Sequence, residues 1–453
     1  MTSERGDDIC SSGPPLTERE AEEQAHGIAF KTGPPGTVGV ELEWLVCDGR
    51  DPALPVDQRR VAAALARLDE PGALPGRGRL TTEPGGQVEL SSAPASGLGG
   101  CVAAAGSDLT AVRQAIAPAG LSLAGHGLDP LRPPRRVLDL PRYAAMEQFF
   151  DRSGPWGRVM MCSTASVQVC VDAGQEQSGP SGFRWRWHLL HGLGPVLVAS
   201  FANSPFQDGR MSGWKSTRQA VWSRLDPSRT RAPADAEPGA ADRGPRWPED
   251  TDPREDWVSY VLDAQVMLLR DPGSRRWTAP TGLTFRDWVR GAAGPPPTAD
   301  DLTYHLSTLF PPVRPRGHLE LRVIDAQPGD GWIVPTAVVS ALLDDPVAAQ
   351  AAMAAVEPLQ KDTRPGELLL RAARHGQDDP QLATASRECF AAADAGLVRL
   401  GAPASIRDAV TGFADRYVLR GRCPADDRLD EARAAVSLLH HPRNPDACLE
   451  ESP

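Results

Sequence analysis

Acidic side chains recur at alternate positions within short apolar runs of the chain. In the run VGVELEWLV, Glu41 and Glu43 lie two residues apart, so an extended strand places them on one face and the apolar residues on the other. The run QVELS carries Glu89, SVQVCVD carries Gln168 and HLELRV carries Glu320 in the same arrangement. The four runs therefore predict four strands, each with one apolar and one polar face.

Carboxylates on one face of a sheet repel one another unless cations lie among them. Glu83 comes just before the second run, and Arg322 lies on the same predicted face as Glu320. Magnesium is bound by carboxylate oxygens together with substrate phosphates, so this composition favours a cleft that holds magnesium. For any single strand, the alternative is an antiparallel sheet with one solvated face.

A second group of residues combines cations with tryptophan. The run WKSTRQAVW contains Lys215 and Arg218, and Arg224 and Arg229 follow it. Arginine beside tryptophan suits the recognition of a substrate carboxylate or phosphate. The alternative for each residue alone is a surface cation whose aliphatic stem packs on the protein.

Other familiar catalytic signatures are absent from the sequence. It has no GxxxxGKS or GxxxxGKT phosphate loop, no HExxH and no GxSxG. We interpret His188 and His191, which lie three residues apart on a predicted buried helix, as core histidines. The eight cysteines are scattered without a CxxC pair, which favours reduced thiols in a cytoplasmic protein over a disulfide framework or a zinc site.

Composition and net charge indicate which classes of partner the protein is expected to bind. Hydrophobic residues make up 41% of the chain and charged residues 24%, as in an ordinary globular protein. The net charge of −11 repels phosphate backbones, so we expect neither nucleic acid nor a membrane as a partner. No run approaches the roughly 18 apolar residues that a membrane helix requires.

We expect one domain over 17–441, between a disordered N-terminal tail (1–16) and a C-terminal tail (442–453). The segment 226–256 is rich in Pro, Asp, Arg and Ala and predicts a long solvated loop, and 336–441 predicts a helical C-terminal part. Further helices are predicted over 17–30, 54–68, 98–117, 183–201 and 257–269.

Six short motifs follow one another along the chain. They are GVELE (39–43), EPGGQVELS (83–91), TASVQV (164–169), FANSPF (201–206), RQAVW (218–222) and LELR (319–322). Together they resemble the glutamate–cysteine ligase family of plant and proteobacterial type, within the carboxylate–amine ligase superfamily. The run WKSTRQAVW and the continuation IDAQP are most similar to the actinobacterial branch, whose product serves ergothioneine biosynthesis.

The resemblance implies an α+β fold, with a curved, mostly antiparallel β-sheet forming a funnel-shaped active site and helices on its outer face, as in glutamine synthetase-like carboxylate–amine ligases. It implies that 17–441 is one catalytic domain. The implied reaction depends on ATP and Mg²⁺. The γ-carboxylate of L-glutamate attacks ATP to give γ-glutamyl phosphate and ADP, and the amine of L-cysteine then displaces phosphate to give γ-glutamylcysteine.

By motif position, the resemblance also implies the site residues. The ligands of two or three Mg²⁺ ions would be Glu41, Glu43, Glu83, Glu89, Gln168 and Glu320. Gln168 stands where the enterobacterial form has a histidine ligand, which resembles the plant pattern. Arg322 and Glu320 are the implied catalytic residues, with Arg322 reaching the transferred phosphoryl group. Arg218 is implied for a glutamate carboxylate, Lys215 for nucleotide or substrate, and Arg142 for phosphate.

Two other functions are compatible with parts of this pattern. A carboxylate–amine ligase that joins glutamate to a different amine would carry the same acidic strands. A non-catalytic binding protein with a solvated acidic face would be expected to lack one or more of the carboxylates, yet every expected acidic position is occupied.

Overall fold

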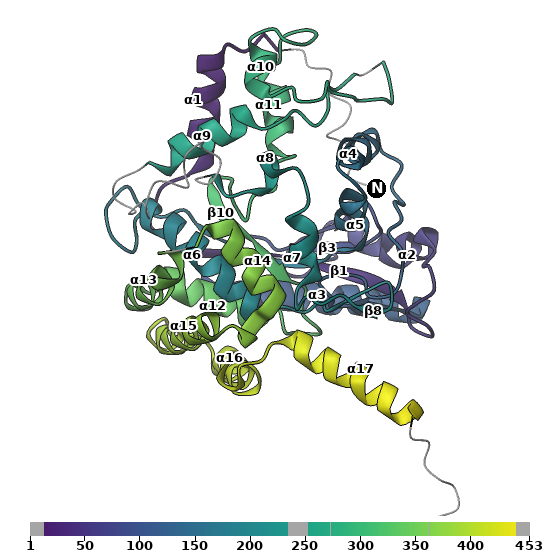
Figure 1. The fold of residues 1–453 in the computed structure, drawn as a ribbon, viewed down its shortest axis with the longest axis vertical. Coiled ribbons are helices and arrows are strands. Elements are labelled where there is room, and N and C mark those ends of the chain that lie inside the picture. Colours follow the sequence, from purple (N-terminus) through teal and green to yellow (C-terminus); the bar gives the residue numbers. More distant parts are fainter. Residues whose placement is uncertain (1–12, 234–251, 272, 362, 441–453) are drawn as a thin grey trace, which may run out of the picture.

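The computed structural model describes residues 13–233, 252–271, 273–361 and 363–440 (Figure 1). Most of the predicted N-terminal tail, the whole C-terminal tail and the central part of the predicted loop at 226–256 lie outside these residues. The described chain forms one large antiparallel sheet with helices around it, which confirms the predicted α+β class.

The main sheet has the strand order β2-β3-β1-β6-β10-β9, and each neighbouring pair is antiparallel. Two further short strands, β4 and β5, also pair with β1. The strands span Thr37–Asp48 (β1), Arg79–Thr82 (β2), Val88–Ser91 (β3), Ala95–Ser96 (β4), Leu121–Ala124 (β5), Ser166–Asp172 (β6), Val313–Pro315 (β9) and His318–Asp325 (β10). The four alternating runs described above become β3, β1, β6 and β10, which are neighbours in the sheet.

Helices of widely different length surround this sheet, and a small hairpin of β7 (Phe206–Gln207) and β8 (Arg210–Met211) lies apart from it. The helices span Glu18–Ala29 (α1), Gln58–Leu65 (α2), Gly97–Ile116 (α3), Pro141–Asp151 (α4), Trp156–Ser163 (α5), Phe183–Phe201 (α6), Thr217–Trp222 (α7), Pro227–Thr230 (α8), Pro253–Asp263 (α9), Phe285–Val289 (α10), Ala299–Leu306 (α11), Ile333–Asp344 (α12), Pro346–Gln360 (α13), Pro365–His375 (α14), Pro380–Arg399 (α15), Ala404–Arg416 (α16) and Pro424–His440 (α17).

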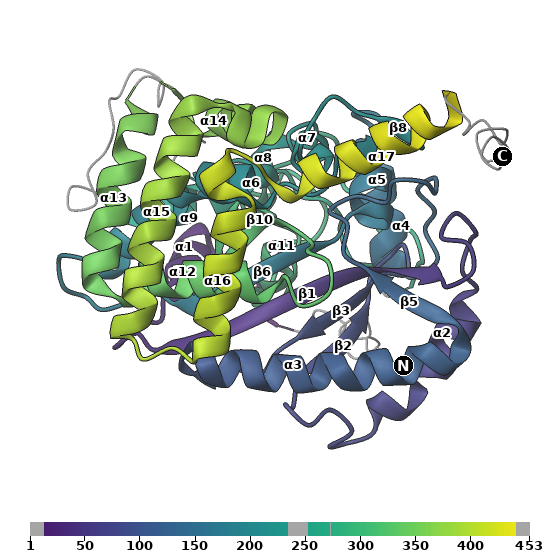
Figure 2. The same ribbon diagram turned by 90° about the horizontal axis from the view of Figure 1, so that it is seen from below.

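Alternation along β1 gives the sheet its apolar face. Val40, Leu42 and Trp44 are buried, whereas Glu41 and Glu43 point to the opposite face. Helix α3 contacts β1 and β3, α12 contacts β6, and α6 contacts β10. Figure 2 shows α13, α15 and α16 side by side; α13 and α15 pack on α6, and α15 and α16 pack on α12. The hydrophobic core therefore lies between the sheet and α3, α6 and α12, and it continues between α6, α12 and these C-terminal helices.

Several predicted helices match the structure closely. Helix α6 occupies the predicted range 183–201, and α1 begins after Thr17, whose side chain and that of Glu20 form the predicted capping box. The predicted helix at 257–269 is shorter than expected, since α9 ends at Asp263. The chain leaves the helix there: Gln265 forms an isolated bridge with Thr284, and Val266 N–H donates to the carbonyl of Leu283.

The prediction of a solvated loop is wrong for its first residues, 226–230. Asp226 caps α8, and the Arg229 side chain is fully buried. Its guanidinium is compensated by Asp226 at 3.1 Å and by the carbonyls of Thr308 and Gln265. Hydrogen bonding to a buried arginine can thus hold a segment in the interior although it lacks large apolar side chains.

The C-terminal part consists of the predicted run of helices, from α12 to α17. Figure 1 shows α17 extending away from the rest of the molecule. Among the described helices none alone is long and apolar enough to cross a membrane, and α12 and α13 reach that length only together, with a bend of 101° between them.

Candidate active site

The predicted carboxylates meet on the polar face of the sheet. Strand β1 supplies Glu41 and Glu43, with Glu43 directly opposite Glu89 of β3 and Glu41 directly opposite Gln168 of β6. The next strand, β10, adds Glu320, which pairs across β6 with the residue two positions beyond Gln168. Residues nearly 280 positions apart in the sequence therefore form one continuous polar row, because the strands that carry them are adjacent.

Hydrogen bonds connect this row from β1 to β10. Gln168 Nε2 donates to Glu43 Oε1 at 2.8 Å, and its Oε1 accepts from Arg322. Arg322 also donates to the carboxylate of Glu320. The amide of Gln168 therefore lies between an acidic and a basic side chain and satisfies both, which a hydrophobic residue at this position could not do.

A β-bulge in β10 places Arg322. Leu321 pairs with Val169 and Ile324 with Val167, so Arg322 and Val323 together oppose the single residue Gln168. Bulges re-aim side chains and are frequent beside active sites. Here the bulge interrupts the regular alternation that the sequence predicted, and Arg322 still lies on the polar face with Glu320.

Four carboxylates of the site hold their protons more tightly than usual. Burial, with the charges of Glu320 and Glu89, raises the pKa of Glu41 to about 7. Burial also raises the pKa of Glu43, Glu83 and Glu89, and neighbouring carboxylates add to the effect in each case. Negative charge on this face is thus incompletely compensated by the protein itself.

Glu320 behaves in the opposite way. Its side chain is fully buried, yet Arg314, Arg322 and Arg316 outweigh the effect of burial and lower its pKa to about 2. Arg314 on β9 contacts both oxygens of the carboxylate, donating from Nη2 to Oε1 at 2.8 Å and from Nε to Oε2 at 3.2 Å. Sequence analysis did not single out Arg314. The available sequence signal was Gly317, directly before the run HLELRV: it has a positive φ of 79° in the turn of the β9–β10 hairpin that places Arg314.

Arg218 is a buried cation with open donors. It lies in α7 with 2% of its surface exposed, and its Nη2 donates to the carbonyl of Arg322 at 2.8 Å. Its Nε and Nη1 have no hydrogen-bond partner in the described structure. The charge of Arg218 lowers the pKa of Glu43 against the effect of burial, so the guanidinium lies near the polar face. Two unfilled donors on a buried guanidinium are suited to an oxyanion.

Comparison with known proteins shows which family has this sequence pattern. The family model described as glutamate–cysteine ligase family 2 matches residues 37–441. The chain belongs to this family. The match begins at the first residue of β1 and ends in the C-terminal helical part, so it includes every residue of the polar row.

Curated relatives of the ligase family extend over nearly the whole chain. The glutamate–cysteine ligase EgtA of Mycobacterium tuberculosis is 40% identical over 423 residues, which cover 90% of each chain. That of Mycolicibacterium smegmatis is 40% identical over 439 residues and 95% of each chain. These relatives confirm the resemblance to the actinobacterial branch and, at the level of the family, the prediction of a glutamate–cysteine ligase.

A solved structure supports the fold. The glutamate–cysteine ligase of Francisella tularensis, determined in complex with AMP, superposes with a TM-score of 0.51 and covers 89% of this chain and 86% of its own. Sequence identity is 12%, so the likeness concerns the architecture alone.

The donor chemistry of the polar row suits the magnesium that such ligases imply. All its candidate ligands are carboxylate or amide oxygens, which hard cations prefer. Among the described residues, no group of three or more His, Cys, Asp and Glu side chains is placed to hold an ion unaided. Magnesium is commonly bound by one or two carboxylates plus substrate phosphates, so the row fits an ion shared with a nucleotide rather than a protein-only cage.

The remaining predicted ligase residues lie in different places. Arg142 on α4 donates to Ser307 at 2.9 Å, and its charge acts on the pKa of Glu83, so it lies at the edge of the acidic group. Lys215 instead forms ion pairs with Asp426 and, at 3.0 Å, Asp378. Arg142 therefore lies near Glu83, one of the predicted metal ligands, whereas the side chain of Lys215 binds two aspartates of the C-terminal part.

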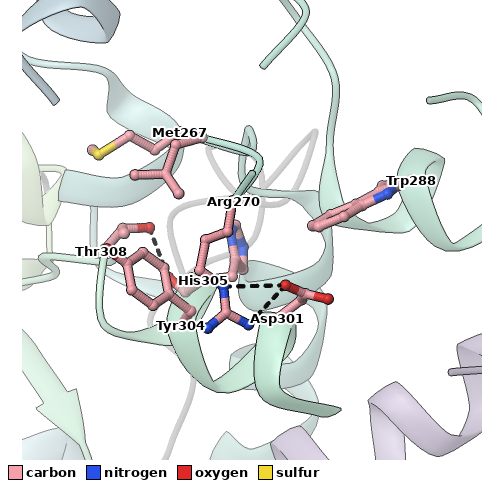
Figure 3. Close-up of a pocket in the computed structure, with 8 residues that line it drawn as sticks. Met267, Arg270, Trp288, Asp301, Tyr304, His305 and Thr308 are labelled. Carbon is pink, nitrogen blue, oxygen red and sulfur yellow. Dashed lines mark hydrogen bonds and ion pairs between the residues drawn. The ribbon is translucent and has the colours of Figure 1, made fainter. Parts of the chain in front are cut away.

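A small cavity between α11 and the segment after α9 lies outside the polar row (Figure 3). Its volume is about 10 Å³, room for about one water molecule. Arg270 and Asp301 form an ion pair at 2.8 Å across one side, and Nδ1 of the buried His305 has no hydrogen-bond partner in the described structure. We interpret this cavity as a structural water position, since it is too small for a substrate of a ligase.

Proposed function

We propose that this enzyme joins the γ-carboxylate of L-glutamate to the amine of L-cysteine, with hydrolysis of ATP to ADP and phosphate, in a reaction that requires Mg²⁺. The observation that carries the proposal is the row of carboxylates on β3, β1 and β10, flanked by Arg322, which is mostly buried, and by the buried Arg218. Family membership and the mycobacterial relatives support the choice of substrates.

The chemistry brings several anions together. The γ-carboxylate and the terminal phosphate of ATP must meet to form γ-glutamyl phosphate, and their repulsion is lowest where fixed positive charge surrounds them. Bound magnesium supplies part of this charge. Arg322 supplies another part from the protein, and its planar guanidinium suits the oxygens of the transferred phosphoryl group.

We propose that five glutamates and one glutamine on or beside the polar face of the sheet are ligands for two or three magnesium ions. They are Glu41, Glu43, Glu83, Glu89, Gln168 and Glu320. Gln168 and Glu320 hold Arg322 in this structure, so their ligand role requires Arg322 to turn from them toward the phosphoryl group. Glu320 would stay compensated in this exchange, because an incoming cation would take the position of the guanidinium beside it.

Substrate binding is assigned to the arginines around this group. Arg218, with two open donors, would receive a carboxylate of glutamate, and Arg142 a phosphate group. Lys215 can serve nucleotide or substrate only if it leaves Asp378 and Asp426. The sheet would be the wall of a funnel-shaped site of the glutamine synthetase-like type, and the AMP complex of the Francisella tularensis ligase is compatible with an adenine nucleotide on this architecture.

We further propose that the product enters ergothioneine biosynthesis, as the similarity to the actinobacterial branch implies. A reaction that consumes free cysteine requires the thiol in its reduced form, which favours the cytoplasm as the compartment. The cysteines described in the structure are unpaired, in keeping with such an environment.

The test is an assay of ADP release with ATP, Mg²⁺ and L-glutamate together with each of a panel of amines. We expect L-cysteine to give the fastest release and γ-glutamylcysteine to accumulate in equal amount. ADP release that depends on another amine would keep the ligase and replace the second substrate. AMP in place of ADP would overturn the acyl-phosphate route, because it indicates an adenylate.

A further inference from the structure

Asp325, the last residue of β10, is a buried acceptor for two distant segments. Its Oδ2 accepts from the backbone N–H of Asn203 at 2.9 Å and from Ser204 Oγ at 2.7 Å. Its Oδ1 accepts from Ser216 Oγ at 2.9 Å. Asp325 is only 2% exposed, and its carboxylate accepts hydrogen bonds from these three neutral donors.

The two segments meet each other as well as Asp325. Ser204 and Ser216 form a parallel bridge, in which Ser204 N–H donates to the carbonyl of Lys215 and Thr217 N–H donates to that of Ser204. Ser216 Oγ also caps α7 by accepting from the N–H of Gln219. The start of α7 is therefore fixed by a carboxylate at the end of the sheet.

Arg218 depends on this arrangement. Its backbone N–H donates to Ser204 Oγ at 3.2 Å, the same hydroxyl that Asp325 accepts from. Its side chain then reaches the carbonyl of Arg322 in the β-bulge, while the neighbouring Gln219 donates to the carbonyl of Val323 at 2.6 Å. The bulge, α7 and Asp325 together fix the guanidinium while Nε and Nη1 stay open.

Close packing leaves Asp325 little freedom to move. A Cβ atom at Gly127 would lie 2.3 Å from Asp325 Cγ, so the glycine backbone touches the carboxylate directly. Burial raises the pKa of Asp325, and among the charges Arg218 opposes this rise most strongly; burial of both groups strengthens their attraction. The carboxylate thus acts on Arg218 both through the serine hydroxyls and through its charge.

We propose that Asp325 is a positioning residue that holds segment 203–218 so that the open donors of Arg218 face the substrate carboxylate. The inference rests on the proposed function for the identity of that carboxylate. Asp325 acts through Arg218, because the donors around it are supplied by the protein.

The main test compares Asp325→Asn with Asp344→Asn. Asp344 is a comparable control at the end of α12, since only 12% of its side chain is exposed and it accepts from Arg186 at 2.9 Å and from a serine. Both variants should lose stability. Only Asp325→Asn should speed amide hydrogen exchange at Ser204 and Arg218, by about tenfold or more, because one of its oxygens becomes a donor facing donors.

Steady-state kinetics give a second readout that loss of stability alone does not change. Asp325→Asn should raise the KM for glutamate by about tenfold or more and leave the KM for ATP within about twofold. In an Arg218→Ala background, Asp325→Asn should add less than about twofold to the KM for glutamate, because residues that act as a unit are not additive. Additive effects, or equal effects on glutamate and ATP, would overturn the proposal.

Two serine variants test the same proposal if the Asp325→Asn protein does not fold. Ser204→Ala and Ser216→Ala each remove one donor to Asp325 without removing a charge, and both should move exchange and glutamate KM in the same direction. Unchanged exchange at Arg218 in both variants would refute the positioning role. A wild-type enzyme without glutamate-dependent ADP release would refute the proposed function instead, and the exchange measurement would still decide whether Asp325 holds the segment.

Discussion

Arg314 and Glu320 face each other across the β9–β10 hairpin, and the guanidinium binds both oxygens of the carboxylate. The pair is buried, so neither charge is screened by water. Glu320 also binds Arg322, which makes it a carboxylate shared between two arginines at the end of the acidic row.

This geometry predicts unequal effects for two neighbouring arginines. Arg314→Met leaves Glu320 with less compensation in the interior and should lower the free energy of unfolding by about 3–5 kcal/mol. Arg316→Met is the matched control, because Arg316 is 56% exposed and lies 3.8 Å from the same carboxylate, and it should cost less than about 1 kcal/mol. Urea denaturation of both variants measures the difference, and equal losses would contradict the structure.

Glu41→Gln tests the acidic row itself. Glu41 gains no arginine hydrogen bond in this structure and its pKa is raised, so the neutral amide should leave the folded protein at least as stable. Turnover should nevertheless fall by about 10² or more, because an oxygen ligand with negative charge is lost. The check is kcat together with the midpoint of thermal unfolding. A stable variant with normal turnover would remove Glu41 from the metal site.

Arg322→Lys separates charge from shape. Lysine keeps the positive charge but loses the planar fork that contacts Gln168 and Glu320 together. We expect kcat to fall by about tenfold or more with the overall fold retained. Circular dichroism and single-turnover ADP formation measure the two properties. Equal rates for the lysine variant would reduce Arg322 to a general electrostatic role.

The pH dependence of stability follows from Glu41. Without magnesium the folded protein keeps this proton to a pH of about 7, whereas the unfolded chain releases it near 4.5. The folded state therefore binds more protons in this window, and the contribution of Glu41 to stability falls as the pH rises through it. Partly buried histidines with a lowered pKa, such as His126, act in the opposite direction, so the total curve alone is not diagnostic.

Comparison of wild type with Glu41→Gln isolates this effect. In chelator, the stability of the variant relative to wild type should increase from about pH 5 to about pH 8, because glutamine does not titrate. Saturating Mg²⁺ should reverse part of the difference at the higher pH, since an ion that binds the folded ionised carboxylate stabilises wild type. A difference that is constant with pH would contradict the raised pKa.

The sequence predicted the parts of the site that depend on local alternation. Glu41, Glu43 and Glu89 were placed on one face because side chains alternate along a strand whatever its neighbours are. Arg314 was missed because its role depends on which strands pair. The ion pairs of Lys215 were missed for a related reason, since Asp378 and Asp426 lie more than 160 positions away and only the packing of the C-terminal helices brings them together.

The extra residue in β10 changes the phase of the strand. Without it, pairing would continue in step, and the alternation that places Arg322 outward would turn Asp325 toward the apolar core. With the extra residue, Arg322 and Asp325 lie on the same face of the sheet although they are three positions apart. Deletion of Val323 should therefore lower stability more than any single substitution at this position. It would move Ile324 and Asp325 to the opposite faces of the sheet.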